Sequence, residues 1–287
     1  MPSLLDIRRR VRSVKNTQQI TKAMKMVSAA KLRRAQDRVI AARPYAESMQ
    51  RMLANVAMAA ADQNHGEGDS LLDVRPEERI QLLVVTADRG LAGGFNANLI
   101  RMAVKFMREH SNAKFQLELI GRKGRDFFRR RQMDITGEHT TLFLKPVEFN
   151  DARAIAQKVI ERYRTAETDA VYLVVNHFKS MMSSQLSMIR VLPVELPKEQ
   201  ERINYIFEEP PNELLAGLLP RYVEGQIYRA MLESAAAEHA ARMTAMEAAS
   251  KNAGEVIDKL TLNMNRIRQA TITREIIEIV SGASALS

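Results

Sequence analysis

The residues best placed for chemistry lie in the stretch TADRGLAGGF, residues 86–95, which follows an apolar run and precedes a helix-like segment. A glycine-bearing turn between a strand and a helix is a common place for a protein to hold phosphate. The glycines at 90, 93 and 94 do not match the G-x-G-x-x-G spacing of dinucleotide sites, and the stretch lacks the Gly-Lys-Ser/Thr ending of a P-loop. The spacing therefore favours a tight structural turn, with a phosphate site as the alternative.

The other candidate groups also favour structural roles. The basic stretch GRKGR, residues 121–125, is interpreted as a solvated basic loop, and Glu275 and Glu278 as a solvated face or an interface pair. The chain has five His at scattered positions and no Cys. This composition predicts no zinc site, no disulfide and no cysteine nucleophile, and it is compatible with a reducing cytoplasm. We expect no catalytic residue, no metal and no cofactor.

The positive charge is concentrated in one segment. The 287 residues carry a net charge of +9, but residues 1–60 alone hold 13 Lys and Arg against 3 Asp and Glu, whereas the other 227 hold 30 against 31. Nucleic acid, an anionic lipid surface or acidic protein loops could each be the counterpart. No aromatic residue precedes Tyr45 to stack on bases, which argues against nucleic acid. No apolar run approaches the roughly 20 residues that cross a bilayer.

The elements that must position these residues begin with two long helices. A heptad register in the first 60 residues has 17 positions, of which 13 are apolar, as in a coiled coil. These positions are Leu4, Ile7, Val11, Val14, Gln18, Thr21, Lys25, Ser28, Leu32, Ala35, Val39, Ala42, Ala46, Met49, Leu53, Val56 and Ala60. The register turns polar between residues 18 and 28, where Ile20, Met24 and Val27 move the apolar stripe to an adjacent face. We interpret this polar break as a place where the helix meets a second partner.

A matching register near the other terminus has 11 positions, of which nine are apolar. They are Leu232, Ala236, His239, Met243, Met246, Ser250, Ala253, Ile257, Leu260, Met264 and Ile267. Because each seam needs a mate, the two helices are expected to pair antiparallel as a coiled-coil shaft of residues 1–60 and 212–287.

The segment between the helices reads as a Rossmann-like α/β insert over residues 75–195, with linkers at 61–74 and 196–211. Strand-like runs at 80–86, 115–120 and 170–177, with weaker ones near 140–144 and 185–192, alternate with helix-like stretches at 96–109, 122–131 and 151–165. This alternation predicts a mostly parallel sheet covered by helices.

The C-terminal helix is expected to be longer than the N-terminal one. Its roughly 70 residues against roughly 58 give an overhang of about 15–20 Å at the helical rise per residue. The apolar side chains of Ile272, Ile276, Ile277, Ile279 and Val280 would lie on this overhang, and an exposed apolar patch usually marks a protein interface.

Three motifs carry a resemblance to a known family. NTQQITKAMKMVSAAK (residues 16–31), TADRGLAGG (86–94) and QATITREIIEIVSGA (269–283) closely resemble the gamma subunit of F-type ATP synthase, in the same order along the whole chain. The resemblance implies a central rotor shaft inside a hexamer of alternating alpha and beta subunits. The α/β insert would lie at its foot, against the epsilon subunit and the membrane ring. The chain would have no catalytic site of its own in a proton-translocating complex at the cytoplasmic face of the bacterial inner membrane.

The resemblance also implies which residues contact partners. It assigns contacts with the alpha/beta hexamer to Met24, Lys25, Lys31, Arg33, Arg242, Arg268, Gln269, Thr273, Ile276, Ile279 and Val280. Tyr205 would approach epsilon and the ring. Two alternatives remain from the residues alone: a nucleotide-using α/β enzyme over residues 75–195, and a nucleic-acid-binding protein.

Overall fold

The structure, a computed structural model, describes residues 4–62, 71–178, 184–196 and 207–286. It divides into two compact units, one made of the described parts of Met1–Ser28 and Arg242–Ser287, and the other of Ala29–Ala241. Two long helices run through both units: α1 (Leu4–Asp62) and α5 (Pro211–Leu286). The predicted domain boundaries, which were placed at the linkers, stay a prediction.

The sheet of the Ala29–Ala241 unit has five strands in the order β3-β2-β1-β4-β5. They are β1 (Arg79–Val85), β2 (Lys114–Ile120), β3 (Ile135–His139), β4 (Ala170–Phe178) and β5 (Ser184–Leu192). β1 pairs in parallel with both β2 and β4, β2 pairs in parallel with β3, and β5 is antiparallel to β4. The prediction of a mostly parallel sheet is confirmed.

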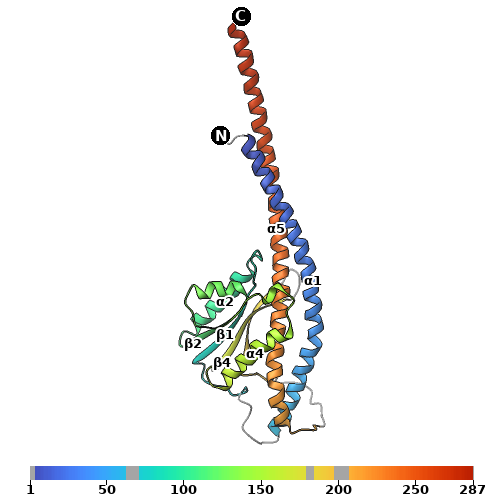
Figure 1. Cartoon of the computed structure of the whole chain (residues 1–287), viewed down its shortest axis with the longest axis vertical. Helices are drawn as coiled ribbons and strands as arrows, with labels where there is room; N and C mark the ends of the chain where they lie inside the picture. Colours follow the sequence, from blue (N-terminus) through green and yellow to red (C-terminus); the bar gives the residue numbers. More distant parts are fainter. Residues whose placement is uncertain (1–3, 63–70, 179–183, 197–206, 287) are drawn as a thin grey trace. The chain divides into compact units, whose positions relative to one another are not determined.

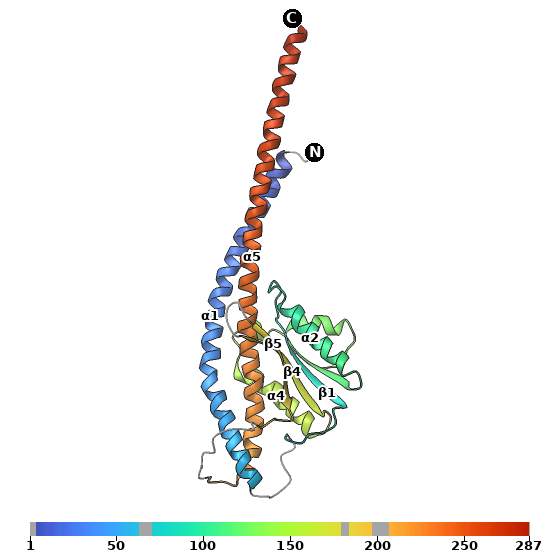
Figure 2. The ribbon, with the colours of Figure 1, turned by 180° about the vertical axis from the view of Figure 1, so that it is seen from behind.

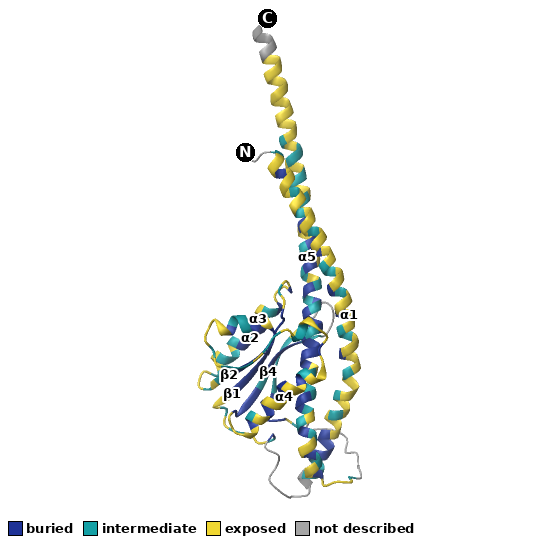
Figure 3. Cartoon of the chain, viewed as in Figure 1, coloured by how far each residue is buried: buried dark blue, intermediate teal, exposed yellow. Residues whose placement is uncertain are grey.

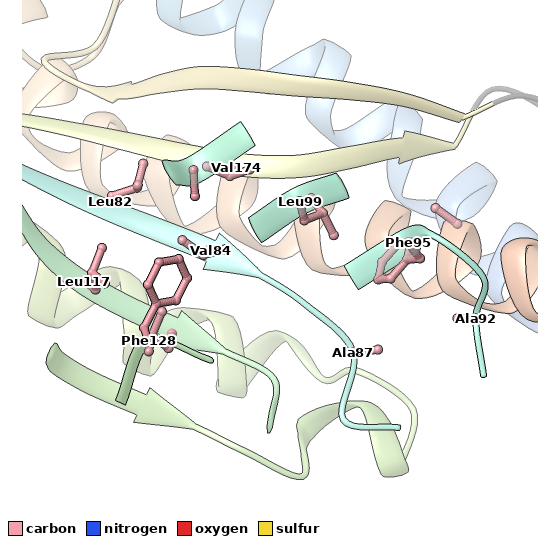
Figure 4. Packing of buried hydrophobic residues seen from close by; sticks show 12 residues of the cluster. Leu82, Val84, Ala87, Ala92, Phe95, Leu99, Leu117, Phe128 and Val174 are labelled. Carbon is pink, nitrogen blue, oxygen red and sulfur yellow. The ribbon is translucent and has the colours of Figure 1, made fainter. Parts of the chain in front are cut away.

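Helices lie on both faces of this sheet. The helices between strands are α2 (Phe95–Glu109), α3 (Arg122–Arg129) and α4 (Phe149–Arg164), with a short 3₁₀ turn, η1, at Leu142–Leu144. α2 and α3 pack against alternate strand residues such as Leu82 and Leu117 (Figure 4). The strand residues that alternate with these point to the opposite face of the sheet. On that face, the guanidinium of Arg162, on α4, donates to Oε1 of Gln116 at 2.6 Å. A central strand covered on both faces is buried along its length, as β1 is from Ile80 to Val85, and all of these residues except Gln81 are apolar.

Strand prediction failed at the β3 edge. The run at 140–144 contains the 3₁₀ turn rather than a strand, and the strand lies at Ile135–His139 instead. The five residues of β3 are half-buried or exposed and include Gly137, so they give no apolar signal. A Cβ at Gly137 would lie 2.0 Å from a carboxylate oxygen of Glu118, so the glycine leaves room for a buried acid on β2.

Both predicted seams are confirmed by burial. All 17 positions of the N-terminal register and all 11 of the C-terminal one are buried or half-buried. Figure 3 shows buried or half-buried stretches alternating with exposed ones along both helices. Within the first unit, Thr21 meets Ser250 and Lys25 meets Glu247, so α1 and α5 are antiparallel there. Pro44 lies inside α1, which continues through it to Asp62.

In the Ala29–Ala241 unit, α5 is buried around almost its whole circumference between residues 230 and 240. Here it packs beside both α1 and the sheet (Figure 2). Small residues, Ala235 to Ala237 among them, let a helix approach its neighbours closely on several sides.

Candidate partner-binding surface and the glycine turn

The glycine turn is occupied by groups of the chain itself. Asp88 is 8% exposed, and its carboxylate accepts hydrogen bonds from the backbone amides of Arg122, Thr141 and Phe143, each at 2.9 Å. Asp88 thus joins the turn after β1 to the start of α3 and to the segment before α4. A carboxylate at the start of α3 also takes the position that a bound anion would take at a helix N-terminus.

The next two amides of α3 are occupied as well. Lys123 N donates to the carbonyl of Ala87 at 3.0 Å, and Gly124 N donates to Thr86 Oγ1 at 2.9 Å. Gly121 has a φ of +98°, and a Cβ there would lie 2.0 Å from the carbonyl oxygen of Thr86. Gly121 is therefore required by both its backbone conformation and this close approach.

These contacts support the interpretation of TADRGLAGGF as a structural turn. Of its three glycines only Gly93 has a positive φ, at +55°, while Leu91 also takes a left-handed conformation at +63°. The interpretation of GRKGR as a solvated loop is wrong in part, because Arg122 begins α3, as the helix-like stretch at 122–131 predicts. The side chains of Arg122 and Lys123 are exposed, as expected.

The polar break of the N-terminal seam is matched by polar groups on α5. Thr21 Oγ1 and Ser250 Oγ lie 2.7 Å apart and are buried, and Gln18 Nε2 donates to the Ser250 carbonyl at 3.1 Å. Lys25 Nζ lies 2.6 Å from Glu247 Oε1, with both side chains partly exposed. The polar residues therefore have mates within the chain, and a second partner is not needed to explain them.

The apolar residues beside this break remain candidates for a partner. Met24 is half-buried, whereas Ile20 and Val27 are 60% and 57% exposed. Met26, which the seam analysis did not single out, is 70% exposed. Ile20, Val27 and Met26 therefore form an exposed apolar patch beside the hydrogen-bonded pair Thr21–Ser250, and such a patch usually marks a protein interface.

Three predicted basic contacts differ in accessibility. Lys31 and Arg33 are exposed on the α1 segment that belongs to the Ala29–Ala241 unit. Arg242 is only 8% exposed. Its side chain is thus better placed to order the chain around it than to reach a partner directly.

The C-terminal end of α5 is exposed over its last described turns. Beyond half-buried Ile267, every residue from Arg268 to Ser281 is exposed. This stretch holds the predicted contacts Arg268, Gln269, Thr273, Ile276, Ile279 and Val280. Ile276 is 55% exposed and Ile279 71%. Thr273 Oγ1 donates to the Gln269 carbonyl at 2.9 Å, which holds its methyl group and hydroxyl against the helix. Tyr205 lies outside the described residues.

A hydrogen-bonded group around the buried Glu233 joins the sheet to α5 and was missed by the sequence reasoning. His177 of β4 hydrogen-bonds to the carboxylate of Glu233, which also accepts from Arg229 Nε at 2.8 Å. Burial opposes ionisation of Glu233, but these two hydrogen bonds outweigh it, so the pKa of Glu233 lies below its ordinary value. Because 56 residues separate His177 from Glu233, no sequence spacing indicates the pair.

Among the residues that the structure describes, no group of three or more His, Asp or Glu side chains is arranged to hold a metal ion. None of the helices there combines the length and the apolar character that crossing a bilayer requires.

Comparison with known proteins identifies the family. A protein-family model described as ATP synthase matches residues 3–286. The chain is 61% identical over 285 residues to the ATP synthase gamma chain of Solibacter usitatus, covering 99% of both. It is 50% identical to that of Pelotomaculum thermopropionicum over the full length of both chains.

Solved structures agree with these relatives. A chain of the central stalk and c-ring structure of the Tetrahymena thermophila mitochondrial ATP synthase is similar, with a TM-score of 0.61, 28% identity and coverage of 80% of this chain and 99% of that one. A chain of the Euglena gracilis mitochondrial ATP synthase, at 19% identity and a TM-score of 0.68, shares the fold and covers 99% of this chain and 94% of its own. The protein therefore belongs to the ATP synthase gamma chain family.

Proposed function

We propose that this chain is the central rotor-stalk subunit of an F-type ATP synthase. In this role it couples the ion-driven rotation of a membrane ring to conformational changes in catalytic beta subunits. Its own contribution is mechanical, since ATP is made and hydrolysed in the surrounding hexamer. The gamma chain relatives, matched along their whole length, support this role.

Coupling requires that the stalk bind different beta conformations with different free energies. A shaft that contacted all three beta subunits equally would shift none of them, because a ligand changes a conformational equilibrium only through its differential affinity. Two unlike helices, with cations on α1 and isoleucines on the end of α5, provide unequal faces. Each rotational position would thus favour a different set of open and closed beta subunits.

The observation that carries the proposal is the exposed apolar end of α5. Ile272, Ile276 and Ile279 are 47%, 55% and 71% exposed on a helix that extends to Leu286. Leaving several isoleucines in water is unfavourable, by about 25 cal/mol for each Å² of apolar surface. We propose that an apolar sleeve of the alpha/beta hexamer encloses this end, with Arg268, Gln269 and Thr273 binding a beta loop at its entrance.

The remaining predicted contacts divide between two regions. Met24, Lys25, Lys31 and Arg33 would face acidic loops of beta, while the α/β insert with Tyr205 would contact epsilon and the ring. We further propose that the protein lies peripherally at the cytoplasmic face of a bacterial plasma membrane, in a proton-driven complex.

Reconstitution tests the proposal. Alpha and beta subunits combined with this chain should give one assembly whose ATPase turns the chain, measured with a bead fixed to its α/β insert. A chain ending at Thr271 should assemble less stably, because the isoleucine-bearing end is removed, while its own urea unfolding stays unchanged. If alpha and beta alone gave an equally coupled ATPase, or if the shortened chain assembled as well as the full one, the proposal would fail.

A charge test separates partner contacts from contacts within the shaft. The double change Lys25→Gln with Arg33→Gln should lower coupling of ATP hydrolysis to rotation. Glu247→Gln breaks the same ion pair from the α5 side and leaves both cations in place. If Glu247→Gln lowered coupling as much as the double change, the pair would act through the coiled coil and the assignment to beta would be wrong.

A further inference from the structure

A cavity of about 400 Å³ lies within the Ala29–Ala241 unit and is partly open to solvent, since Tyr45, Gln50 and Arg229 of its lining are exposed. Its walls come from α1, α5, β4, β5 and the first residue of α4, with Met49, Leu173 and Ile189 among the apolar side chains that line it. This volume falls in the range of sites that bind small molecules. None of the residues assigned above to partner contacts lines it.

Small residues keep this space open. Ala42 and Ala46 lie one turn apart on α1, and Gly225 lies on α5. A Cβ at Gly225 would meet no atom within 4 Å. Larger side chains at these three positions would fill the cavity. Protein interiors normally contain few such spaces, because unfilled apolar space forfeits packing contacts.

One polar atom of the lining lacks a partner. Gln226 Oε1 is buried and makes no hydrogen bond to any described residue. A buried acceptor without a donor costs about 1–3 kcal/mol. A ligand that carries an N–H or O–H group would remove this cost.

The charges around the cavity favour an uncharged occupant. Of the described residues that line it, none is Asp or Glu. The side chains of Arg229 and His177, which also line it, both hydrogen-bond to Glu233. An ionised ligand would thus lose its hydration without gaining an unpaired counter-charge.

Four aromatic rings line the same space. They belong to Tyr45, Phe149, Tyr222 and Tyr228. The rings of Phe149 and Tyr228 meet edge to face, with centroids 5.4 Å apart. Aromatic walls of this kind suit a flat ring system, which can stack on one ring and meet the edge of another.

We propose that this cavity is a binding site for an uncharged, ring-bearing small molecule whose N–H or O–H group donates to Gln226. Such a molecule would contact α1, α5 and the β4–β5 pair at the same time. It would stabilise their packing, because a ligand that binds only the folded state raises stability by mass action. The site is independent of the proposed contacts with alpha and beta.

The probe for this site is N-phenyl-1-naphthylamine, an uncharged aromatic amine with a naphthyl and a phenyl group and one N–H donor, which fluoresces in apolar surroundings. Titration into the full chain should give saturable binding and a raised melting temperature. The matched compound 1-anilinonaphthalene-8-sulfonate has the same ring skeleton with a negative charge. It should bind at least about tenfold more weakly, because the cavity has no free counter-charge.

Two glycines of α5 provide matched variants. Gly225→Leu places a side chain in the cavity and should weaken binding about tenfold or more. Gly217→Leu makes the same change in helix propensity on the same helix, where a Cβ also meets nothing within 4 Å, but outside the cavity lining. It should bind as the unchanged chain does. Gln226→Leu removes the acceptor and should weaken binding about fivefold.

Three results would overturn the proposal: no saturable binding to the unchanged chain, equal binding of the charged compound, or unchanged binding by Gly225→Leu. The third would place the probe on exposed apolar surface, such as the isoleucines of α5. If Gly225→Leu failed to fold, Ala46→Leu would fill the cavity from α1 and must weaken binding for the proposal to stand.

Discussion

Replacing Asp88 by alanine tests whether the glycine turn is a structural joint. The carboxylate accepts three backbone hydrogen bonds, two at Oδ1 from Arg122 and Thr141 and one at Oδ2 from Phe143. Asp88→Ala removes both acceptor oxygens and with them all three hydrogen bonds. At about 1 kcal/mol for each amide left without its partner, the free energy of unfolding should fall by about 3 kcal/mol.

Asparagine at the same position gives a graded result. Asp88→Asn keeps an oxygen for Arg122 and Thr141 but turns an NH₂ group toward the amide of Phe143, so one hydrogen bond is lost and two become weaker. The expected loss is about 1–2 kcal/mol, between that of the alanine variant and none. Asp37→Ala, at an exposed position on α1 of the same unit, should change stability by no more than about 0.5 kcal/mol.

Urea unfolding followed by tyrosine fluorescence is the appropriate assay. All six tyrosines of the chain lie between residues 29 and 241, so their signal reports the unit that contains the turn. Hydrogen exchange should also become faster at the amides of residues 122, 141 and 143 in Asp88→Ala. The reasoning is refuted if Asp88→Ala matches Asp37→Ala, or if asparagine is as harmful as alanine.

Three further predictions concern other parts of the structure. Thr21→Val and Ser250→Ala should show a coupling of about 1 kcal/mol in a double-mutant cycle of thermal unfolding, and additive effects would exclude their hydrogen bond. Gly121→Ala should destabilise the chain by more than about 2 kcal/mol in urea, because its Cβ meets a backbone carbonyl at positive φ, whereas Gly217→Ala should be neutral or stabilising; the reverse order would contradict this. The pKa of Glu233 is lowered by folding, so its ion pairing stabilises the chain above the unfolded pKa and is lost as pH falls through the folded one. The difference in urea midpoint between the unchanged chain and Glu233→Gln should therefore shrink as pH falls from about 6 to about 3, and a constant difference would refute it.

The long helices and the inner strands could be predicted from sequence because burial of apolar side chains dominates the pattern of each. The heptad seams and the apolar positions of strands β1, β2 and β4 are repeated burial patterns, and the structure buries or half-buries every seam position. β3 could not be predicted in the same way, since its five residues lie at the sheet edge and none is fully buried. Its pairing depends on Gly137 and on a glutamate 19 residues earlier.

Polar pairs were beyond sequence reasoning for a different reason. The polar break in the N-terminal seam was visible, but its partners, Ser250 and Glu247, lie more than 220 residues away. As long as the register between the two helices is unknown, polar partners on α5 and polar partners on another subunit would give the same polar break in the sequence. Asp88 presents the same difficulty, because the three amides it binds belong to two later segments. The accessible end of α5 was predicted, since it follows from helix length alone.

The pairing of the first and last helices has a consequence for synthesis on the ribosome. Thr21 emerges 229 residues before Ser250, its partner in the seam. At about 5–20 residues per second, the apolar stripe of α1 is without its mate for about 10–45 s. During that time it can associate with other nascent chains or be covered by a chaperone. During translation, the N-terminal helix is therefore the part of the shaft that must be protected from association with other chains.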